Sequence, residues 1–135
     1  MLGIANYGEL PKLDELDMLK GGGEPAEFTA VGYGLQSYNQ NAIEAAKVRM
    51  VSHPHLIQIN TDLTGDFSLI LSNNHATGGT CFGDSGGPNF LGNSNVIAGV
   101  TSAQKNTNCA GTYGVYRMDR KDDLDWLDSI LAEYH

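Results

Sequence analysis

The strongest constraint on the fold is a series of short β-prone segments, closely spaced and separated by turn-forming Gly, Pro and Asn residues. They occupy residues 28–34, 47–51, 56–60, 67–72, 88–91, 95–101 and 113–118. The segment 47–51 alternates polar and apolar residues with period two, and 56–60 continues the same sheet after Pro54, so we count about six strands. Short strands that follow one another closely favour a closed barrel over an open sheet with exposed edges.

The periodicity changes at the C-terminus. Apolar residues recur there at helical spacing, at Leu124, Leu127, Ile130 and Leu131. Acidic residues precede them, where carboxylates cap free N–H groups and oppose the helix dipole: Asp119, Asp122 and Asp123. The predicted fold class is therefore all-β, a six-stranded antiparallel β-barrel with a C-terminal α-helix.

The first part of the chain, residues 1–27, is predicted to be a connector. One or two helical turns are compatible with the spacing of Leu13, Leu16 and Leu19. The glycines at 21–23 would end these turns, and Pro25 would prevent the helix from continuing. The barrel and its helix then occupy residues 28–135.

Composition excludes several classes of protein. The chain has 135 residues, 41% hydrophobic and 18% charged, which suits one globular domain. Its net charge of −8 and its lack of a basic stripe argue against nucleic-acid binding. No apolar run approaches the roughly 20 residues needed to span a bilayer, and residues 1–10 do not have the layout of a secretory signal peptide.

The segment richest in chemistry is Gly83-Asp84-Ser85-Gly86-Gly87-Pro88. A nucleophilic Ser needs an exposed hydroxyl on a tight turn, with backbone N–H groups directed at the developing oxyanion. Glycines on both sides permit such a turn and the close approach of a substrate backbone. Taken alone, Gly-Asp-Ser-Gly is also compatible with a Gly-rich hairpin loop that contains an incidental Ser.

The wider context resembles the chymotrypsin/trypsin-like serine proteases. Residues 79–88 are similar to the nucleophile loop of that family, and Val96–Ser102 to the strand that follows it. Tyr113–Tyr116 resembles the family's Pro-Gly-Val-Tyr strand, Phe28–Gly34 its first second-barrel strand, and Trp126 lies in what resembles its terminal helix. The resemblance covers residues 28–135 and so concerns the second, C-terminal barrel only.

The resemblance implies a role for each residue of the loop. Ser85 would be the nucleophile, the N–H groups of Gly83 and Ser85 the oxyanion hole, and Cys81–Cys109 a disulfide. In the family, the carboxylate at the position of Asp84 pairs with an amino terminus created by zymogen cleavage. Because no such amino terminus is present here, we expect Asp84 to turn outward or take another partner, and the oxyanion loop to be partly collapsed.

The resemblance also implies a substrate pocket. Gly79 and Thr80 would form its floor, Thr101-Ser102-Ala103 one wall and Gly114 the opposite wall. Gly79 supplies no carboxylate to select Lys or Arg, so an apolar or aromatic side chain is the expected preference. Ala103, where the family often has Gly, would narrow the entrance.

The catalytic base is missing from the sequence. The family takes its His and Asp from the first barrel, and the chain has neither the Ala-His-Cys nor the Asp-Ile-Ala-Leu-type motif. We expect His53, His55, His75 and His135 to be surface or partly packed residues that do not reach Ser85. Losing a triad partner costs about 10⁶ in rate, so the chain alone should be inactive or nearly so. No cofactor and no metal site is expected.

Three functions remain open at this stage: a serine endopeptidase, a non-catalytic protease-like binding module, and an acyl-transfer or esterase-like enzyme with a different base. The expected partners are a peptide or protein substrate and either an N-terminal barrel encoded elsewhere or a second copy, since one barrel alone exposes an apolar face. The family resemblance and the Cys pair indicate a secreted or extracellular protein.

Overall fold

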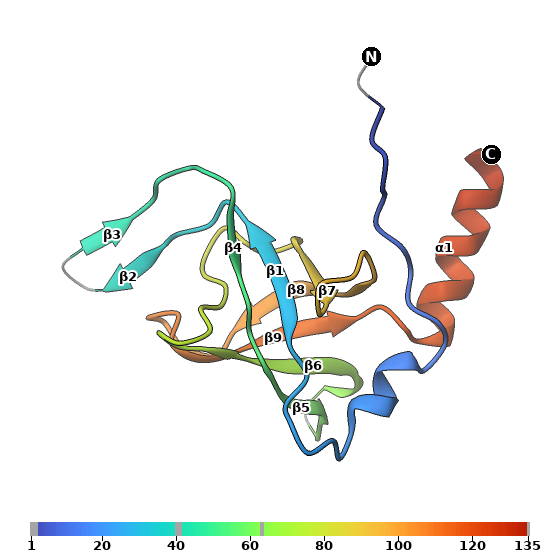
Figure 1. The fold of residues 1–135 in the computed structure, drawn as a ribbon, viewed down its shortest axis with the longest axis horizontal. Helices are drawn as coiled ribbons and strands as arrows, with labels where there is room; N and C mark the ends of the chain where they lie inside the picture. Colours follow the sequence, from blue (N-terminus) through green and yellow to red (C-terminus); the bar gives the residue numbers. More distant parts are fainter. Residues whose placement is uncertain (1–2, 40–41, 63, 135) are drawn as a thin grey trace.

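The structure is a computed structural model that describes residues 3–39, 42–62 and 64–134. It is mostly β, with one 3₁₀ helix near the start and one α-helix at the end (Figure 1). In chain order the elements are η1 (Glu15–Leu19), β1 (Phe28–Gly32), β2 (Ser37–Asn39), β3 (Ala42–Glu44), β4 (Met50–Ser52), β5 (Leu56–Thr61), β6 (Gly65–Asn73), β7 (Pro88–Leu91), β8 (Ile97–Gln104), β9 (Gly111–Arg117) and α1 (Lys121–Tyr134).

Seven strands form one curled antiparallel sheet in the order β4-β1-β7-β8-β9-β6-β5. Its two edge strands, β4 and β5, are consecutive in sequence and meet at Pro54. There the Phe28 N–H donates to the Pro54 carbonyl (2.8 Å) and the Leu56 N–H donates to the Ala26 carbonyl (2.8 Å). The run from Met50 to Thr61 thus pairs with β1 at its start and with β6 further on, which curls the sheet back on itself.

The expected barrel has six strands and the sheet has seven. The difference arises at Pro54, which has no N–H for a sheet ladder and so divides one continuous run into β4 and β5. The expectation of an all-β fold with a terminal helix is confirmed.

The β2–β3 hairpin was not predicted. It forms a separate two-stranded sheet in the register Ser37↔Glu44 and projects from the main sheet (Figure 1). Each strand has only three residues, too few to show a period-two pattern in the sequence.

The core lies inside the curled sheet. Leu69 and Leu71 from β6, Tyr113 and Val115 from β9, and Phe28 from β1 are almost fully buried. Leu16 of η1 joins the same cluster and is 0% exposed. The N-terminal connector therefore supplies a core residue.

A buried ion pair fastens η1 to the end of β9. The Arg117 guanidinium donates to both carboxylate oxygens of Asp119, at 2.9 and 2.8 Å, and both side chains are fully buried. The same Asp119 carboxylate accepts the backbone N–H of Leu16 at 2.8 Å. One buried carboxylate thus neutralises a buried cation and holds the connector in place.

The terminal helix α1 extends away from the sheet (Figure 1), and none of its residues is fully buried. Trp126 is 61% exposed and Leu131 47% exposed. In the part of the chain that the structure describes, no helix has the length and apolarity needed to cross a membrane.

Candidate functional site

The loop between β6 and β7 carries the predicted nucleophile on two consecutive tight turns. The Asp84 N–H donates to the Cys81 carbonyl (3.1 Å), and the Gly87 N–H donates to the Asp84 carbonyl (2.9 Å). Gly83 and Gly86 have φ values of 99° and 83°, which favour residues without a Cβ. The local turn geometry therefore accounts for glycines at these two positions.

The second turn is fixed to strand β8. The Gly86 N–H donates to the Thr101 carbonyl and the Thr101 N–H donates to the Gly87 carbonyl, both at 2.9 Å. Ser85 lies exposed at the tip of this turn. Among the described residues, no hydrogen bond joins its hydroxyl to His53, His55 or His75; His135 lies outside the described residues.

The Asp84 side chain is anchored beneath the loop. One carboxylate oxygen accepts the Gly34 N–H at 2.8 Å and the other accepts the Cys81 N–H at 2.9 Å. The sequence left two alternatives for the Asp84 carboxylate, to turn outward or to take another partner. The structure shows the second, with the N–H groups of Gly34 and Cys81 as partners. A Cβ at Gly32 or at Gly34 would overlap the carboxylate, so both glycines make room for it.

The β2–β3 hairpin braces the same loop. The Leu35 N–H donates to the Phe82 carbonyl at 2.9 Å, and the rings of Tyr38 and Phe82 make an edge-to-face contact with centroids 5.3 Å apart. Sequence reasoning missed Gly34, Tyr38 and Phe82. These contacts join segments far apart in the sequence, so no local pattern predicts them. The one available signal was the glycine pair Gly32 and Gly34.

The predicted oxyanion donors are the N–H groups of Gly83 and Ser85. Within the described chain, neither N–H donates to a backbone or side-chain acceptor. Their role as oxyanion donors stays a prediction. The expectation of a partly collapsed loop stays a prediction.

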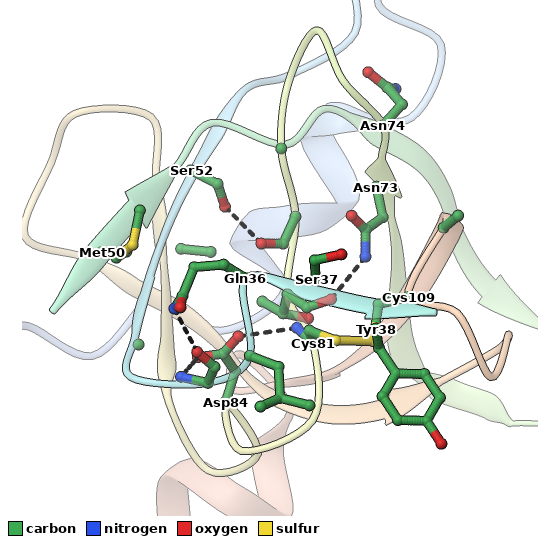
Figure 2. Close-up of a pocket in the computed structure, with 18 of the residues that line it drawn as sticks. Gln36, Ser37, Tyr38, Met50, Ser52, Asn73, Asn74, Cys81, Asp84 and Cys109 are labelled. Atoms are coloured by element: carbon green, nitrogen blue, oxygen red, sulfur yellow. Dashed lines mark hydrogen bonds between the residues drawn. A yellow bond between two sulfur atoms is a disulfide. The ribbon is translucent and has the colours of Figure 1, made fainter. Parts of the chain in front are cut away.

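An open cavity of about 500 Å³ lies beside the loop (Figure 2). Asp84 and the Cys81–Cys109 disulfide line it, together with the predicted floor residues Gly79 and Thr80. The disulfide that the family resemblance implied is thus present. The predicted wall residues Thr101, Ser102, Ala103 and Gly114 do not line this cavity.

The predicted wall residues come together on two paired strands. Ala103 of β8 is the register partner of Gly114 of β9, beside an irregularity that follows Thr101. Ser102 and Ala103 are exposed, whereas Thr101 is buried. The six residues predicted to form the floor and walls include no carboxylate, and their roles in binding stay predictions.

Polar side chains fix the residues that were predicted to form the floor. The Gln104 amide donates to the Thr80 carbonyl (2.8 Å) and hydroxyl (2.9 Å), and the Asn73 amide donates to the same carbonyl (2.7 Å). A Cβ at Gly79 would overlap the Asn73 side chain. Glycine at this position is therefore explained by close packing.

A second set of buried polar side chains links β9, β7 and β8. The Tyr113 hydroxyl donates to Asn89 (2.7 Å), whose amide donates to the Thr101 hydroxyl (2.9 Å). Burial, followed by the negative charge of Asp84, raises the pKa of Tyr113 far above its ordinary value. Tyr113 is therefore a neutral hydrogen-bond donor that links β9 to Asn89 of β7 and, through it, to Thr101 of β8, the strand to which the nucleophile loop is bonded.

The sequence comparison decides the family. The Trypsin family model matches residues 20–122, which is most of the chain and includes the whole nucleophile loop. The chain belongs to the trypsin family. No curated protein sequence matches it.

Solved structures of trypsin-like fold resemble the chain. A mutant of human heparin binding protein is 18% identical with a TM-score of 0.64, and covers 91% of this chain and 48% of its own. The atomic-resolution structure of heparin binding protein is 18% identical with a TM-score of 0.65, and the match covers 91% of this chain and 49% of that protein. HL collagenase is 20% identical with a TM-score of 0.65, and the match covers 91% of this chain and 52% of that protein. The chain therefore shares their fold over about half of their length.

Proposed function

We propose that this trypsin-family chain is the nucleophile-bearing half of a serine-type endopeptidase, with acyl-enzyme chemistry at Ser85. One observation carries the proposal. Ser85 stands exposed at the tip of a doubly turned loop, while the adjacent N–H groups of Gly83 and Ser85 have no internal acceptor in the described chain. Family membership over residues 20–122 supports the assignment of this loop to proteolysis.

The chemistry follows from those groups. The Ser85 oxygen forms a bond to the scissile carbonyl carbon while its proton passes to a general base. The Gly83 and Ser85 N–H groups stabilise the resulting oxyanion. The carbon–nitrogen bond then breaks, the leaving amine takes the proton, and water hydrolyses the acyl-enzyme.

The general base is the part of the proposal that lies outside the described residues. No His of the described chain is hydrogen-bonded to Ser85, and the chain spans about half the length of its structural neighbours. We assign the base and its Asp partner to a first barrel. Without them the rate falls by about 10⁶, so the chain alone is nearly inactive.

A first barrel or a second copy of the chain is the proposed partner. The exposed Trp126 and Leu131 of α1 offer it apolar surface, as does the exposed Val51 of β4. The proposed substrates are peptides or proteins with apolar or aromatic side chains at the cleavage site, because Gly79 brings no charge to the predicted floor. The proposed location is extracellular, in agreement with the Cys81–Cys109 disulfide.

A non-catalytic protease-like binding module is the second candidate. It is favoured by the lack of a hydrogen bond between Ser85 and any described His. An esterase-like or acyl-transfer enzyme that uses Ser85 with a different base is the third. The three candidate functions differ in whether Ser85 reacts and in which general base activates its hydroxyl.

Fluorophosphonate labelling separates the three functions. We expect little labelling of the chain alone and clear labelling of Ser85 after a trypsin-type first barrel, with its His and Asp, is added. Ser85→Ala should abolish the label and leave the fold intact. Strong labelling of the chain alone would favour the esterase-like enzyme. No labelling even with the added barrel would reject both enzymatic functions and leave the binding module.

A further inference from the structure

A second cluster of reactive side chains lies away from the nucleophile loop, at the junction of β4 and β5. His53 and His55 flank Pro54, and both rings lie near the Glu27 carboxylate. The Nδ1 atom of His53 and the Nε2 atom of His55 are each 3.8 Å from a different oxygen of Glu27. Residues two apart in an extended segment point to the same face, which explains why both rings reach one carboxylate.

Strand pairing brings Glu27 to this position. Glu27 and His55 are directly opposed in an antiparallel bridge. The hydrogen bonds on either side join Phe28 to Pro54 and Leu56 to Ala26, so Glu27 and His55 form a non-hydrogen-bonded pair. Side chains approach most closely in pairs of that kind.

The backbone that carries the two histidines is fixed. The His53 N–H donates to the Thr77 carbonyl and the His55 N–H donates to the Ser72 hydroxyl, both at 2.9 Å. Pro54 between them is fully buried and has a restricted φ. The spacing of the two backbone positions that carry the imidazoles is therefore set before any ligand arrives.

The three side chains are open to solvent. Their exposed fractions are 50% for His53, 40% for His55 and 46% for Glu27. The chain has a net charge of −8, which attracts cations to its surface. An ion can thus reach the cluster without any rearrangement of the fold.

We propose that His53, His55 and Glu27 bind a divalent transition-metal ion of the Zn²⁺ or Ni²⁺ type. Two imidazole nitrogens and one carboxylate oxygen form a donor set that suits these ions better than Mg²⁺ or Ca²⁺. Each imidazole nitrogen is 3.8 Å from one oxygen of Glu27, a gap that two bonds of about 2.1 Å to one ion can bridge. Because the two gaps end at different oxygens, binding of a single ion by all three side chains requires the rings to turn.

Among the described residues, no three His, Cys, Asp or Glu side chains are already placed to hold a metal ion, so binding requires the half-exposed rings to rotate. The Thr29 hydroxyl lies 3.5 Å from Nδ1 of His53 and donates to the Gly92 carbonyl at 2.7 Å. This hydroxyl therefore contacts the same His53 nitrogen that would bind the metal. The remaining coordination positions are left to water or to an external ligand.

Calorimetric titration of the full chain, free of any polyhistidine tag, tests the proposal. With ZnCl₂ or NiCl₂ we expect one site per chain, and with MgCl₂ none. His53→Ala and His55→Ala should each weaken binding by at least about tenfold, the lower limit for loss of a supporting group around a metal. Glu27→Gln, which keeps the shape of the side chain, should weaken it less.

His75→Ala is the matched control, because His75 is an exposed His on a separate loop. It should bind the metal as the unmodified chain does. The imidazole NMR signals of the unmodified chain provide a second readout that depends on no variant: only those of His53 and His55 should shift with metal. No binding by the unmodified chain, equal binding by the His53 and His55 variants, or shifts at His75 instead would overturn the proposal. None of these results depends on activity at Ser85.

Discussion

The carboxylate of Asp84 accepts a hydrogen bond of 2.8 Å from the backbone N–H of Gly34, a residue 50 positions earlier in the chain. Its second oxygen accepts the Cys81 N–H. The loop that presents Ser85 is therefore tied to the segment between β1 and β2. A charged acceptor with two N–H donors is a strong anchor for a turn.

Replacing this acceptor should destabilise the loop. Asp84→Asn keeps the shape but directs an NH₂ group at one of the two N–H donors, leaving a partly buried donor unsatisfied. We expect a loss of about 1–3 kcal/mol in the free energy of unfolding, measured by urea titration. Ser85→Ala, at the exposed neighbouring position, should change it by less than about 0.5 kcal/mol. Equal stabilities for Asp84→Asn and the unmodified chain would show that the anchor contributes nothing.

The Arg117–Asp119 pair gives the largest predicted effect. Asp119→Ala leaves the fully buried Arg117 without its main partner and removes the acceptor of the Leu16 N–H. We expect a loss of about 3–5 kcal/mol, or failure to fold, in thermal and urea unfolding. Asp128→Asn on the exposed surface of α1 is the control and should be nearly neutral. A loss below 1 kcal/mol for Asp119→Ala would contradict this prediction.

The Cys81–Cys109 disulfide closes a loop with a sequence separation of 28. In the chain-entropy account, such a cross-link stabilises the fold by roughly 3–4 kcal/mol. Adding dithiothreitol should lower the unfolding midpoint by a matching amount. A double variant, Cys81→Ser with Cys109→Ser, should start lower and show no response to the reductant. A response in the double variant would mean that the reductant acts elsewhere.

Acid should weaken the attachment of η1. The hydrogen bond from Lys20, and then the contacts with Arg117, hold the pKa of Asp17 below its ordinary value of 3.8. A carboxyl group whose pKa is lower in the folded state than in the unfolded state stabilises the fold at pH values above its unfolded pKa. That stabilisation is lost as the pH falls below 3.8 and through the folded-state pKa. Asp17 is 39% exposed, so Asp17→Asn should cost no more than about 1 kcal/mol at neutral pH.

The pH dependence distinguishes this electrostatic effect from lost packing. The stability difference between Asp17→Asn and the unmodified chain should shrink as the pH of urea titrations is lowered below 3.8. A difference of the same size at pH 7 and at strongly acidic pH would assign the effect to packing.

The sequence alone determined the features that depend on local chemistry. Alternating apolar residues predicted the strands, helical spacing predicted α1 (Lys121–Tyr134), and glycines around Ser85 predicted a tight turn. The family resemblance on residues 79–88 then predicted the Cys81–Cys109 disulfide. These predictions succeeded because backbone preferences and turn geometry act over a few residues.

Only the tertiary structure decided which distant groups meet. The pairing of the segment around Glu27 with the Pro54 junction places the Glu27 carboxylate 3.8 Å from one ring nitrogen of each of His53 and His55. Similarly, the β2–β3 hairpin brings Tyr38 to Phe82. Likewise, the docking of η1 sets Leu16 on the buried Asp119. No local pattern encodes such contacts, because a shift of one residue in strand pairing would turn each side chain to the opposite face.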